Sequence, residues 1–541
     1  MEVGFAIDLG TSGIRIHSID LKVGKIMGTT IALHNPIPGA NVMDHLHFAL
    51  IAGEEVAHRL LINAVNELID TLDVNPGDVR RVAVCGNPIQ LSIFQGISLG
   101  DLAYADAGYL KRHKIKQIER DSMVVSAESI GLLFPGADVY IPPAVKHEIG
   151  ADALAMIIES GLLKNEDPSL VIDYGTNAEM ALKVGDTIFT GSAAAGPAIE
   201  GEQIKNGIHT SPGAISDFEF DVQGGWGAIV LDDELMGQKG DVVDILNEKI
   251  KKGRRDIDIK GITGTGVIAL IAIGLYSGVI SPPKIRTSDH KIHLPGNITF
   301  YEEDLKEAGK AIGAIRAGYS TLALKAGIKL TDITRAYMAG ASGTYVDALK
   351  ARRAGLISPS PEIYQIGNTS LMLARDLVMN PDLLHELQDI AEKLRSTYVF
   401  FPTSKEFEDI YLLELGYWTE NMPIELYIDH LSKYGYDLGV NSSSPTTVNR
   451  LVERDIPVIG EKGLKVVRDI GVTLSAEFEH CTGCKKCEKT CPERALKIVE
   501  VGEDRYKAVI ISELCNGASC LRCVDVCPLC IFNFEKMISK V

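Results

Sequence analysis

Two segments of the chain repeat one order of apolar, acidic and small residues. FAIDLGTSGIRI (residues 5–16) and LVIDYGTNAEMAL (residues 170–182) each begin with apolar residues, reach an Asp and a Gly-Thr turn, and then become apolar again. Apolar stretches joined by a short run of Gly and small polar residues are typical of β-hairpins. The sequence therefore predicts two lobes of related design.

Helices and strands alternate between and after these hairpins. One helix is predicted from apolar residues at helical spacing, which are Leu60, Leu61, Ala64, Val65, Leu68, Ile69 and Leu72. A short strand follows at 81–85 and ends at Gly86-Asn87-Pro88. The most apolar stretch, 267–280, is only fourteen residues long and contains two glycines, so it predicts a buried helix and no membrane span. Alternating helices and strands favour an α/β fold.

Nine of the ten cysteines lie in the last sixty or so residues. The first run is Cys481, Cys484, Cys487 and Cys491, followed by Pro492, and the second is Cys515, Cys520, Cys523 and Cys527, followed by Pro528. The first run has the C-x2-C-x2-C-x3-C-P spacing of bacterial two-cluster ferredoxins, in which the fourth cysteine of a run ligates the other cluster. We therefore expect two 4Fe-4S clusters with crossed ligation, while a pair of zinc ribbons is the alternative.

Three further cysteine features qualify this pattern. The first gap of the second run, between Cys515 and Cys520, is two residues longer than in the first run. Cys530 has no place among eight ligands, so we expect a buried spare thiol, with altered ligation of the second cluster as the alternative. Cys85 closes an apolar strand and is expected in the core.

Composition narrows the class of protein. A chain of 541 residues is long enough for three or four domains. The net charge of −18, without a long basic run, argues against nucleic acid and anionic membrane surfaces as partners, although a basic protein partner remains open. The start, MEVGFAIDLG, lacks the positive charge of a signal peptide, and clustered cysteines suit a reducing interior. We expect a cytoplasmic protein.

The duplicated hairpins carry residues suited to phosphate. An Asp at a strand end, followed by Gly and hydroxyl residues, offers a carboxylate for magnesium and backbone N–H groups for phosphate oxygens. A third small-residue turn, at 340–344, adds to them. Together the three resemble the phosphate and adenosine loops of the superfamily of acetate and sugar kinases, heat-shock chaperone ATPases and actin, which implies two lobes closing on ATP. The matching residues are Asp8, Gly10, Thr11, Ser12 and Gly13, then Asp173, Gly175, Thr176 and Asn177, then Gly340, Ala341, Gly343 and Thr344.

This resemblance implies a role for each aspartate. Asp8 and Asp173 would position magnesium and the attacking water, and the hairpin amides would stabilise charge on the γ-phosphate. Glu128 and Asp152 lie near small residues in the connecting segments. We expect both on the solvated surface, with a magnesium role as the less favoured alternative.

An ATPase joined to a ferredoxin resembles the reductive activators of corrinoid enzymes, in particular those that serve methylamine methyltransferases of methanogenic archaea. The supporting strings are HNPIPGANVMDHLHFA, GNPIQ, EIGADALA, AAGPAIEGEQI, GITGTG and IGNTSLMLA. The resemblance implies ATP-dependent reduction of inactive Co(II) to Co(I) in corrinoid proteins, with an unidentified low-potential electron donor. The chain has no Asp-x-His-x-x-Gly motif, so the corrinoid should belong to the partner. We expect His45, His47 and His480 to be structural or surface residues.

The resulting fold prediction is an α/β two-lobed ATPase of that superfamily with a C-terminal α+β two-cluster ferredoxin domain. Its boundaries are 1–165 for the first lobe, 166–418 for the second, 419–472 for a connecting segment and 473–541 for the ferredoxin domain. Many members of the resembled family carry an N-terminal plant-type cluster, whereas this sequence starts directly in the ATPase.

Three other functions stay open at this point. An ATP-driven activator of a radical dehydratase or aromatic-ring reductase would usually place cluster cysteines within the ATPase, where this chain has only Cys85. A small-molecule kinase with a ferredoxin tail would ignore reductant. A nucleotide-responsive electron-transfer adaptor would bind ATP without hydrolysing it, so that Asp8→Ala and Asp173→Ala would leave its activity intact.

Overall fold

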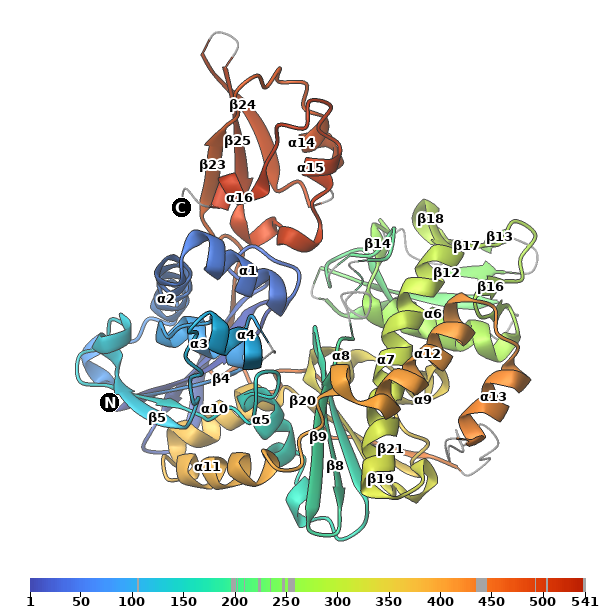
Figure 1. Cartoon of the computed structure of the whole chain (residues 1–541), viewed down its shortest axis with the longest axis horizontal. Coiled ribbons are helices and arrows are strands. Elements are labelled where there is room, and N and C mark those ends of the chain that lie inside the picture. Colours follow the sequence, from blue (N-terminus) through green and yellow to red (C-terminus); the bar gives the residue numbers. More distant parts are fainter. Residues whose placement is uncertain are drawn as a thin grey trace. The chain divides into compact units, whose positions relative to one another are not determined.

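The fold was analysed in a computed structural model of the chain. The structure describes residues 1–104, 107–195, 201, 203–208, 210–221, 225–233, 235–245, 249–251, 258–433, 445–491, 493–502 and 505–538. The chain forms two compact units, and Figure 1 labels many of their elements. Unit 1 comprises Met1–Ala155, Ser370–Lys393 and Val458–Val541, and unit 2 comprises Met156–Thr369 and Leu394–Pro457.

Unit 1 is built on a seven-stranded sheet of order β22-β3-β2-β1-β4-β6-β5. Its strands are β1 (Val3–Leu9), β2 (Ile14–Asp20), β3 (Lys25–Ala32), β4 (Val79–Gly86), β5 (Met123–Ser126), β6 (Asp138–Ile141) and β22 (Leu464–Val467). β1, β2 and β3 are antiparallel, and β4 pairs in parallel with β1. All seven residues of β1 are buried, as a central strand of apolar residues requires.

Helices cover this sheet because their apolar faces need burial. They are α1 (Val42–Ala52), α2 (Glu54–Asp70), α3 (Pro88–Gln95), α4 (Ala107–Arg112), α5 (Ala151–Glu159), α10 (Thr369–Met379) and α11 (Leu383–Leu394). The helix predicted from residues 60 to 72 is α2, and the strand predicted at 81–85 lies within β4.

The core of unit 2 repeats the hairpin arrangement of unit 1. Its six-stranded sheet has the order β21-β20-β19-β7-β8-β9. The strands are β7 (Ser169–Tyr174), β8 (Ala178–Val184), β9 (Thr187–Ala193), β19 (Arg335–Ala339), β20 (Glu362–Gly367) and β21 (Thr447–Arg450). β7, β8 and β9 are antiparallel and β19 pairs in parallel with β7, which is the arrangement of β1, β2, β3 and β4. Two lobes of related design are therefore confirmed.

A second sheet and several helices complete unit 2. The sheet has the order β13-β12-β11-β10-β14. Its strands are β10 (Ala214–Phe220), β11 (Trp226–Leu231), β12 (Gly237–Asp244), β13 (Lys249–Lys251) and β14 (Gly261–Ile262), and two small hairpins are β15 (Ile280–Ser281) with β16 (Lys284–Ile285) and β17 (Lys291–Leu294) with β18 (Ile298–Tyr301). The helices are α6 (Gly264–Ser277), α7 (Glu302–Ala326), α8 (Gly340–Tyr345), α9 (Ala348–Ala354), α12 (Lys405–Thr419) and α13 (Ile424–Lys433).

The apolar stretch predicted as a buried helix is α6. The Thr263 hydroxyl caps its start by accepting a hydrogen bond from Gly266 N–H at 3.1 Å, and Gly278 ends it in the left-handed conformation. Residues 267 to 274 of this helix are all buried. No helix in the described ranges is both long and apolar enough to cross a bilayer.

The cysteine-rich part is a small α+β fold within unit 1. A three-stranded antiparallel sheet of order β23-β25-β24 packs with three short helices. These elements are β23 (Thr473–Glu477), β24 (Leu496–Gly502), β25 (Arg505–Ile511), α14 (Lys486–Thr490), α15 (Arg522–Asp525) and α16 (Phe534–Ile538).

The structure differs from the predicted boundaries in two places. Residues 370–393 were assigned to the second lobe, but α10 and α11 belong to unit 1. They do so because Arg81 donates to Val378 O at 3.1 Å and Gln388 donates to Asp121 at 3.0 Å. The connecting segment 419–472 is also no simple linker, since β21 extends one large sheet and β22 the other. Its residues 434–444 lie outside the described residues.

Candidate nucleotide and iron-sulfur sites

The first predicted phosphate loop lies in unit 1, directly after β1. Asp8 is 5% exposed near the end of that strand. A Cβ atom at Gly10 would lie 2.7 Å from Gly13 O, and one at Gly13 would lie 2.4 Å from Ala32 O, so neither position has room for a side chain. Asn87 Nδ2 donates to Thr11 Oγ1 at 3.2 Å. The turn is thus tight and braced from the GNPIQ segment, which suits a loop that must present its backbone to a ligand.

A second carboxylate accompanies Asp8. Burial raises the pKa of Asp152, at the start of α5, to about 6, and the charge of Asp8 adds to the effect. Arg15 Nη1 lies 3.3 Å from Asp8 Oδ2 and offsets part of the negative charge. The expectation that Asp152 is a solvated surface residue is therefore wrong, because the start of α5 brings it into the Asp8 site. Two neighbouring carboxylates can share a proton or bind a divalent cation.

Glu128, the other carboxylate considered from the sequence, is a surface residue as expected. Its side chain is exposed and accepts a hydrogen bond from Gly136 N–H at 3.1 Å. That contact closes a local turn, so Glu128 has a structural role in this loop.

The second phosphate loop and the predicted adenosine loop adjoin each other in unit 2. The structure forms residues 340–345 as the short helix α8 and not as the predicted turn, and the name adenosine loop is kept here for residues 340–344. β7 and β19 are parallel neighbours, with Asp173 paired to Ala339, so both loops leave the same edge of the sheet. A Cβ atom at Gly340, where φ is +79°, would lie 2.4 Å from Asp173 Oδ1. Only glycine fits this position, both for its conformation and for the space beside the carboxylate. Gly175, Thr176 and Asn177 form the turn that follows Asp173.

A buried glutamine holds the adenosine loop in place. Gln365 Nε2 donates to the carbonyl oxygens of Gly343 at 2.8 Å, Thr344 at 3.2 Å and Val346 at 2.9 Å. Thr344 Oγ1 donates to Gly340 O at 2.8 Å, while Ala341 is partly exposed. The loop conformation is therefore fixed from the protein side, which keeps Gly340 against Asp173.

Sequence reasoning missed Glu179. It pairs with Asp173 across β7 and β8, and directly paired residues point to the same face of a sheet. Its carboxylate is 5% exposed and accepts a hydrogen bond from Ser192 Oγ at 3.2 Å. The signal was a lone acidic residue in the otherwise apolar strand AEMAL. In unit 1 the residue paired with Asp8 is Arg15, so the two hairpins differ in charge at this position.

The cysteines of the tail line two cavities of similar size. The first has an empty volume of about 470 Å³, open solvent included, and its wall includes Cys481, Cys484, Cys487 and Cys527. The second has an empty volume of about 420 Å³, measured in the same way, and its wall includes Cys491, Cys515, Cys520 and Cys523. Each cavity thus takes three cysteines from one run and the fourth from the other, which is the crossed grouping that the spacing predicts. Pro492 lies outside the described residues.

The chemistry of these cavities fits iron-sulfur clusters. Burial raises the pKa of Cys515 and of Cys523 to about 12, so thiolates there need a bound cation as compensation. Four thiolates around a cavity of this kind match the ligand set of a cubane cluster. Among the described side chains, no three His, Cys, Asp or Glu residues converge on a site for a single metal ion.

Two cysteines stand outside both cavities. Cys530 is exposed, so the expectation of a buried spare thiol is wrong. Cys530 lies at the end of a turn that begins at Cys527. In this turn Cys530 N–H donates to Cys527 O at 3.0 Å, and the φ of Cys530 is +52°. Cys85 is buried at the end of β4, as predicted.

Three family models match the chain. The "RACo middle region" matches residues 3–165, the "C-terminal domain of RACo the ASKHA domain" matches residues 167–427, and the "4Fe-4S dicluster domain" matches residues 480–531. The first two cover the regions that hold the two hairpins, and the third contains all eight cysteines of the two cavities.

Individual proteins agree with these matches. The chain is 46% identical over 520 residues to the "[Co(II) methylated amine-specific corrinoid protein] reductase" of Methanosarcina barkeri, covering 95% of both chains. It is 24% identical over 392 residues to the "Corrinoid activation enzyme RamQ" of Eubacterium limosum, covering 65% of this chain and 60% of that one. A solved "Reductive activator for corrinoid,iron-sulfur protein" has the same fold, with a TM-score of 0.60 at 24% identity over 78% of this chain and 68% of that chain.

Proposed function

Because the chain belongs to the RACo family of reductive activators, we propose that it is an ATP-dependent reductase of methylated amine-specific corrinoid proteins. The match to the Methanosarcina barkeri protein carries this proposal, since it runs through both ATPase regions and the ferredoxin part. The reaction adds one electron to the inactive Co(II) corrinoid of the partner and yields Co(I). The electron comes from a low-potential donor outside the chain.

ATP makes this unfavourable reduction possible through differential affinity. A nucleotide that binds one conformation of the activator more tightly shifts the population toward it, and that conformation can in turn bind the corrinoid protein more tightly. The cobalt is then held in the state that accepts an electron. The residues that sense ATP and the residues that contact the cobalt need not be the same.

The nucleotide-binding residues have separate roles in this proposal. The amides of residues 10–13 and 175–177 bind phosphate oxygens, and residues 340–344 contact the adenosine, with Gly340 and Gly343 allowing this segment to pack against Asp173 and Tyr174. Asp8 in unit 1 and Asp173 in unit 2 would each act on hydrated magnesium or on the attacking water. When bound, the magnesium ion compensates the phosphate charge during transfer. Asp152, beside Asp8, accepts or releases a proton at this site.

The cysteines provide the redox part. Cys481, Cys484, Cys487 and Cys527 hold one 4Fe-4S cluster, and Cys491, Cys515, Cys520 and Cys523 hold the other. The bound clusters supply one-electron carriers of low potential. The protein contributes the thiolates, partial burial of most of them and the fixed position of the two cavities.

The experiment compares Asp8→Asn and Asp173→Asn with the wild type, using Asp70→Asn as the control because Asp70 is exposed on α2. Under anaerobic conditions we measure ATP turnover and the yield of Co(I) with a methylamine corrinoid protein. Both site variants should lose most of both activities, and the control should keep them. If the site variants produce Co(I) as the wild type does, ATP hydrolysis at these residues is not part of the reaction.

A further inference from the structure

The residues between Cys515 and Cys520, where the second cysteine run is longer than the first, contact the ATPase part of unit 1. We name residues 516–519, between Cys515 and Cys520, the docking loop. Asp44 Oδ1 accepts hydrogen bonds from Ser519 N–H at 2.9 Å and Ser519 Oγ at 2.8 Å. Asn41 Nδ2 donates to Ser519 Oγ at 2.8 Å. Asp44 is 4% exposed whereas Ser519 is an exposed residue, so these charge-assisted bonds are partly shielded from water, which strengthens them.

Backbone contacts strengthen the same junction. Gly39 N–H donates to Cys515 O at 2.8 Å, and Ser512 Oγ donates to Pro36 O at 2.7 Å. A Cβ atom at Gly517 would lie 2.9 Å from Gly39 Cα and 3.1 Å from Asp44 Cβ, so the two backbones pack directly. The segment 36–44 therefore contacts the chain on both sides of Cys515, a residue of the second cavity.

The same segment is bonded at its other end to the first phosphate loop. Asn35 Nδ2 donates to Gly10 O at 3.1 Å and lies 3.3 Å from Gln90 Oε1. Gln90 Nε2 lies 2.5 Å from His45 Nδ1, and His45 follows Asp44 on α1. Asn35, Gln90 and His45 are all buried. We name these three residues the coupling network, because a continuous chain of hydrogen bonds links Gly10 to α1.

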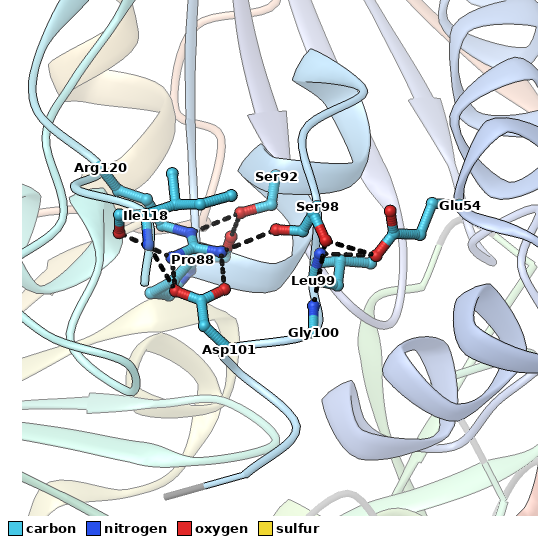
Figure 2. A network of polar contacts seen from close by, with 9 residues as sticks. All are labelled: Glu54, Pro88, Ser92, Ser98, Leu99, Gly100, Asp101, Ile118 and Arg120. Carbon is cyan, nitrogen blue, oxygen red and sulfur yellow. Dashed lines mark hydrogen bonds and ion pairs between the residues drawn. The ribbon is translucent and has the colours of Figure 1, made fainter. Parts of the chain in front are cut away.

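An ion pair fixes the helix that carries Gln90. Figure 2 shows Arg120 bound to both carboxylate oxygens of Asp101, at 2.8 and 2.9 Å, and donating to Ser92 Oγ at 2.8 Å. Ser92 Oγ in turn donates to Pro88 O at 2.6 Å, within α3. These contacts anchor α3 at Ser92, while Gln90 of the same helix contacts Asn35 and His45.

We infer that Asn41 and Asp44 are positioning residues that hold the docking loop, and that the coupling network makes this hold depend on the nucleotide at Gly10. The second part rests on the proposed function, because it requires phosphate at the first loop. The two extra residues between Cys515 and Cys520 lengthen the docking loop, which joins two cysteines of the second cavity. Through its contact with Asp44, the bound nucleotide changes how firmly this loop is held.

The test measures hydrogen exchange in the anaerobically purified, cluster-loaded full chain, on peptides covering residues 512–523. The exchange rate is compared without nucleotide, with Mg·ADP and with a non-hydrolysable Mg·ATP analogue. Asp44→Ala and Ser519→Ala should speed exchange of this segment by on the order of tenfold or more without nucleotide, since bonds to a charged group are lost. The Asp70→Ala variant, on the exposed face of α2, is the control and should exchange as the wild type does.

A third variant separates docking from coupling. Gln90→Met keeps the length of the side chain but removes its amide, so exchange without nucleotide should stay slow while the response to nucleotide disappears. The electron paramagnetic resonance spectrum of the reduced protein should change for one cluster in Asp44→Ala and stay unchanged in Asp70→Ala.

The results decide separately whether Asp44 holds the docking loop and whether this hold depends on nucleotide. If both Asp44→Ala and Ser519→Ala exchange at the wild-type rate, the docking contact is refuted. If Gln90→Met keeps the full nucleotide response, or if the wild type binds nucleotide and shows no response, the coupling is refuted. If a titration shows that the wild type binds no nucleotide, the proposed function fails, and the comparison without nucleotide still decides the docking contact.

Discussion

Gly340 offers a sharp test of the nucleotide site, because alanine there would collide with Asp173. The added Cβ atom would lie 2.4 Å from Asp173 Oδ1, whereas real Cβ atoms essentially never lie closer than 3.0 Å to another heavy atom. The carboxylate or the loop must therefore move by at least about half an ångström. Misplacement of a reacting group by about 1 Å can cost roughly 100-fold in rate, so we expect Gly340→Ala to lose about 10- to 100-fold in ATP turnover.

The variant Gly327→Ala is a matched control for backbone strain. Gly327 ends α7 with a φ of +70°, close to the +79° of Gly340, but nothing lies within 4 Å of a Cβ atom there. Both substitutions place an alanine in the left-handed region, at a cost of about 1–2 kcal/mol each. Both proteins should thus be destabilised to a similar degree by strain alone, and only Gly340→Ala should in addition disturb Asp173.

The assay combines urea unfolding with ATP turnover. We expect Gly340→Ala to lose the strain energy that Gly327→Ala loses and more because of the collision with Asp173, and we expect a loss of turnover in Gly340→Ala alone. Wild-type turnover in Gly340→Ala would refute the placement of Asp173 in the reaction. An equal loss of turnover in both variants would show that general destabilisation, and not the contact with Asp173, is responsible.

Three more predictions follow from single residues. The pKa of Asp152 is about 6 in the folded protein and about 3.9 in the unfolded chain, so the folded state binds a proton there more tightly. This proton binding contributes its full free energy of unfolding, ~3 kcal/mol at most, below about pH 4. The contribution is lost as the pH rises through 6. Asp152→Asn should flatten this slope in urea unfolding between pH 4 and 7 in magnesium-free buffer, and an unchanged slope would contradict the assignment. Cys527→Ser should lose about half of the bound iron and sulfide, and Cys530→Ser should lose none, because only Cys527 lines a cavity. Loss of iron in Cys530→Ser instead of Cys527→Ser would show that the assignment of cysteines to the two clusters is wrong. Asp101→Asn should lower the unfolding free energy by about 3–5 kcal/mol at most, since it leaves the largely buried Arg120 without its carboxylate partner, and a loss below about 1 kcal/mol would mean that solvent screens the pair.

The fold was predictable where a short pattern determines a local structure. The hairpins around Asp8 and Asp173, the helix at 54–70 and the buried helix α6 all follow from periodicity and turn residues within a few positions. The grouping of cysteines was also predictable, because the spacing within each run limits which sulfur atoms can surround one cavity.

What the sequence did not reveal depends on contacts between distant segments. Asp152 joins Asp8, and residues 370–393 pack in unit 1, only because parallel strands and crossing helices bring them there. Glu179 was hidden in an apolar strand, where its pairing with Asp173 becomes visible only with the register of the sheet. The partner of the docking loop lies more than 470 positions away along the chain, at Asp44. No local pattern contains such information.

The most direct test of ATP-dependent corrinoid reduction is a visible spectrum recorded under strict anaerobiosis. The purified, cluster-loaded protein is mixed with a strong reductant and a Co(II) methylamine corrinoid protein, first without and then with Mg·ATP. We predict that the Co(I) spectrum appears only after ATP is added. Co(I) that forms equally well without ATP, or that never forms, would contradict the account.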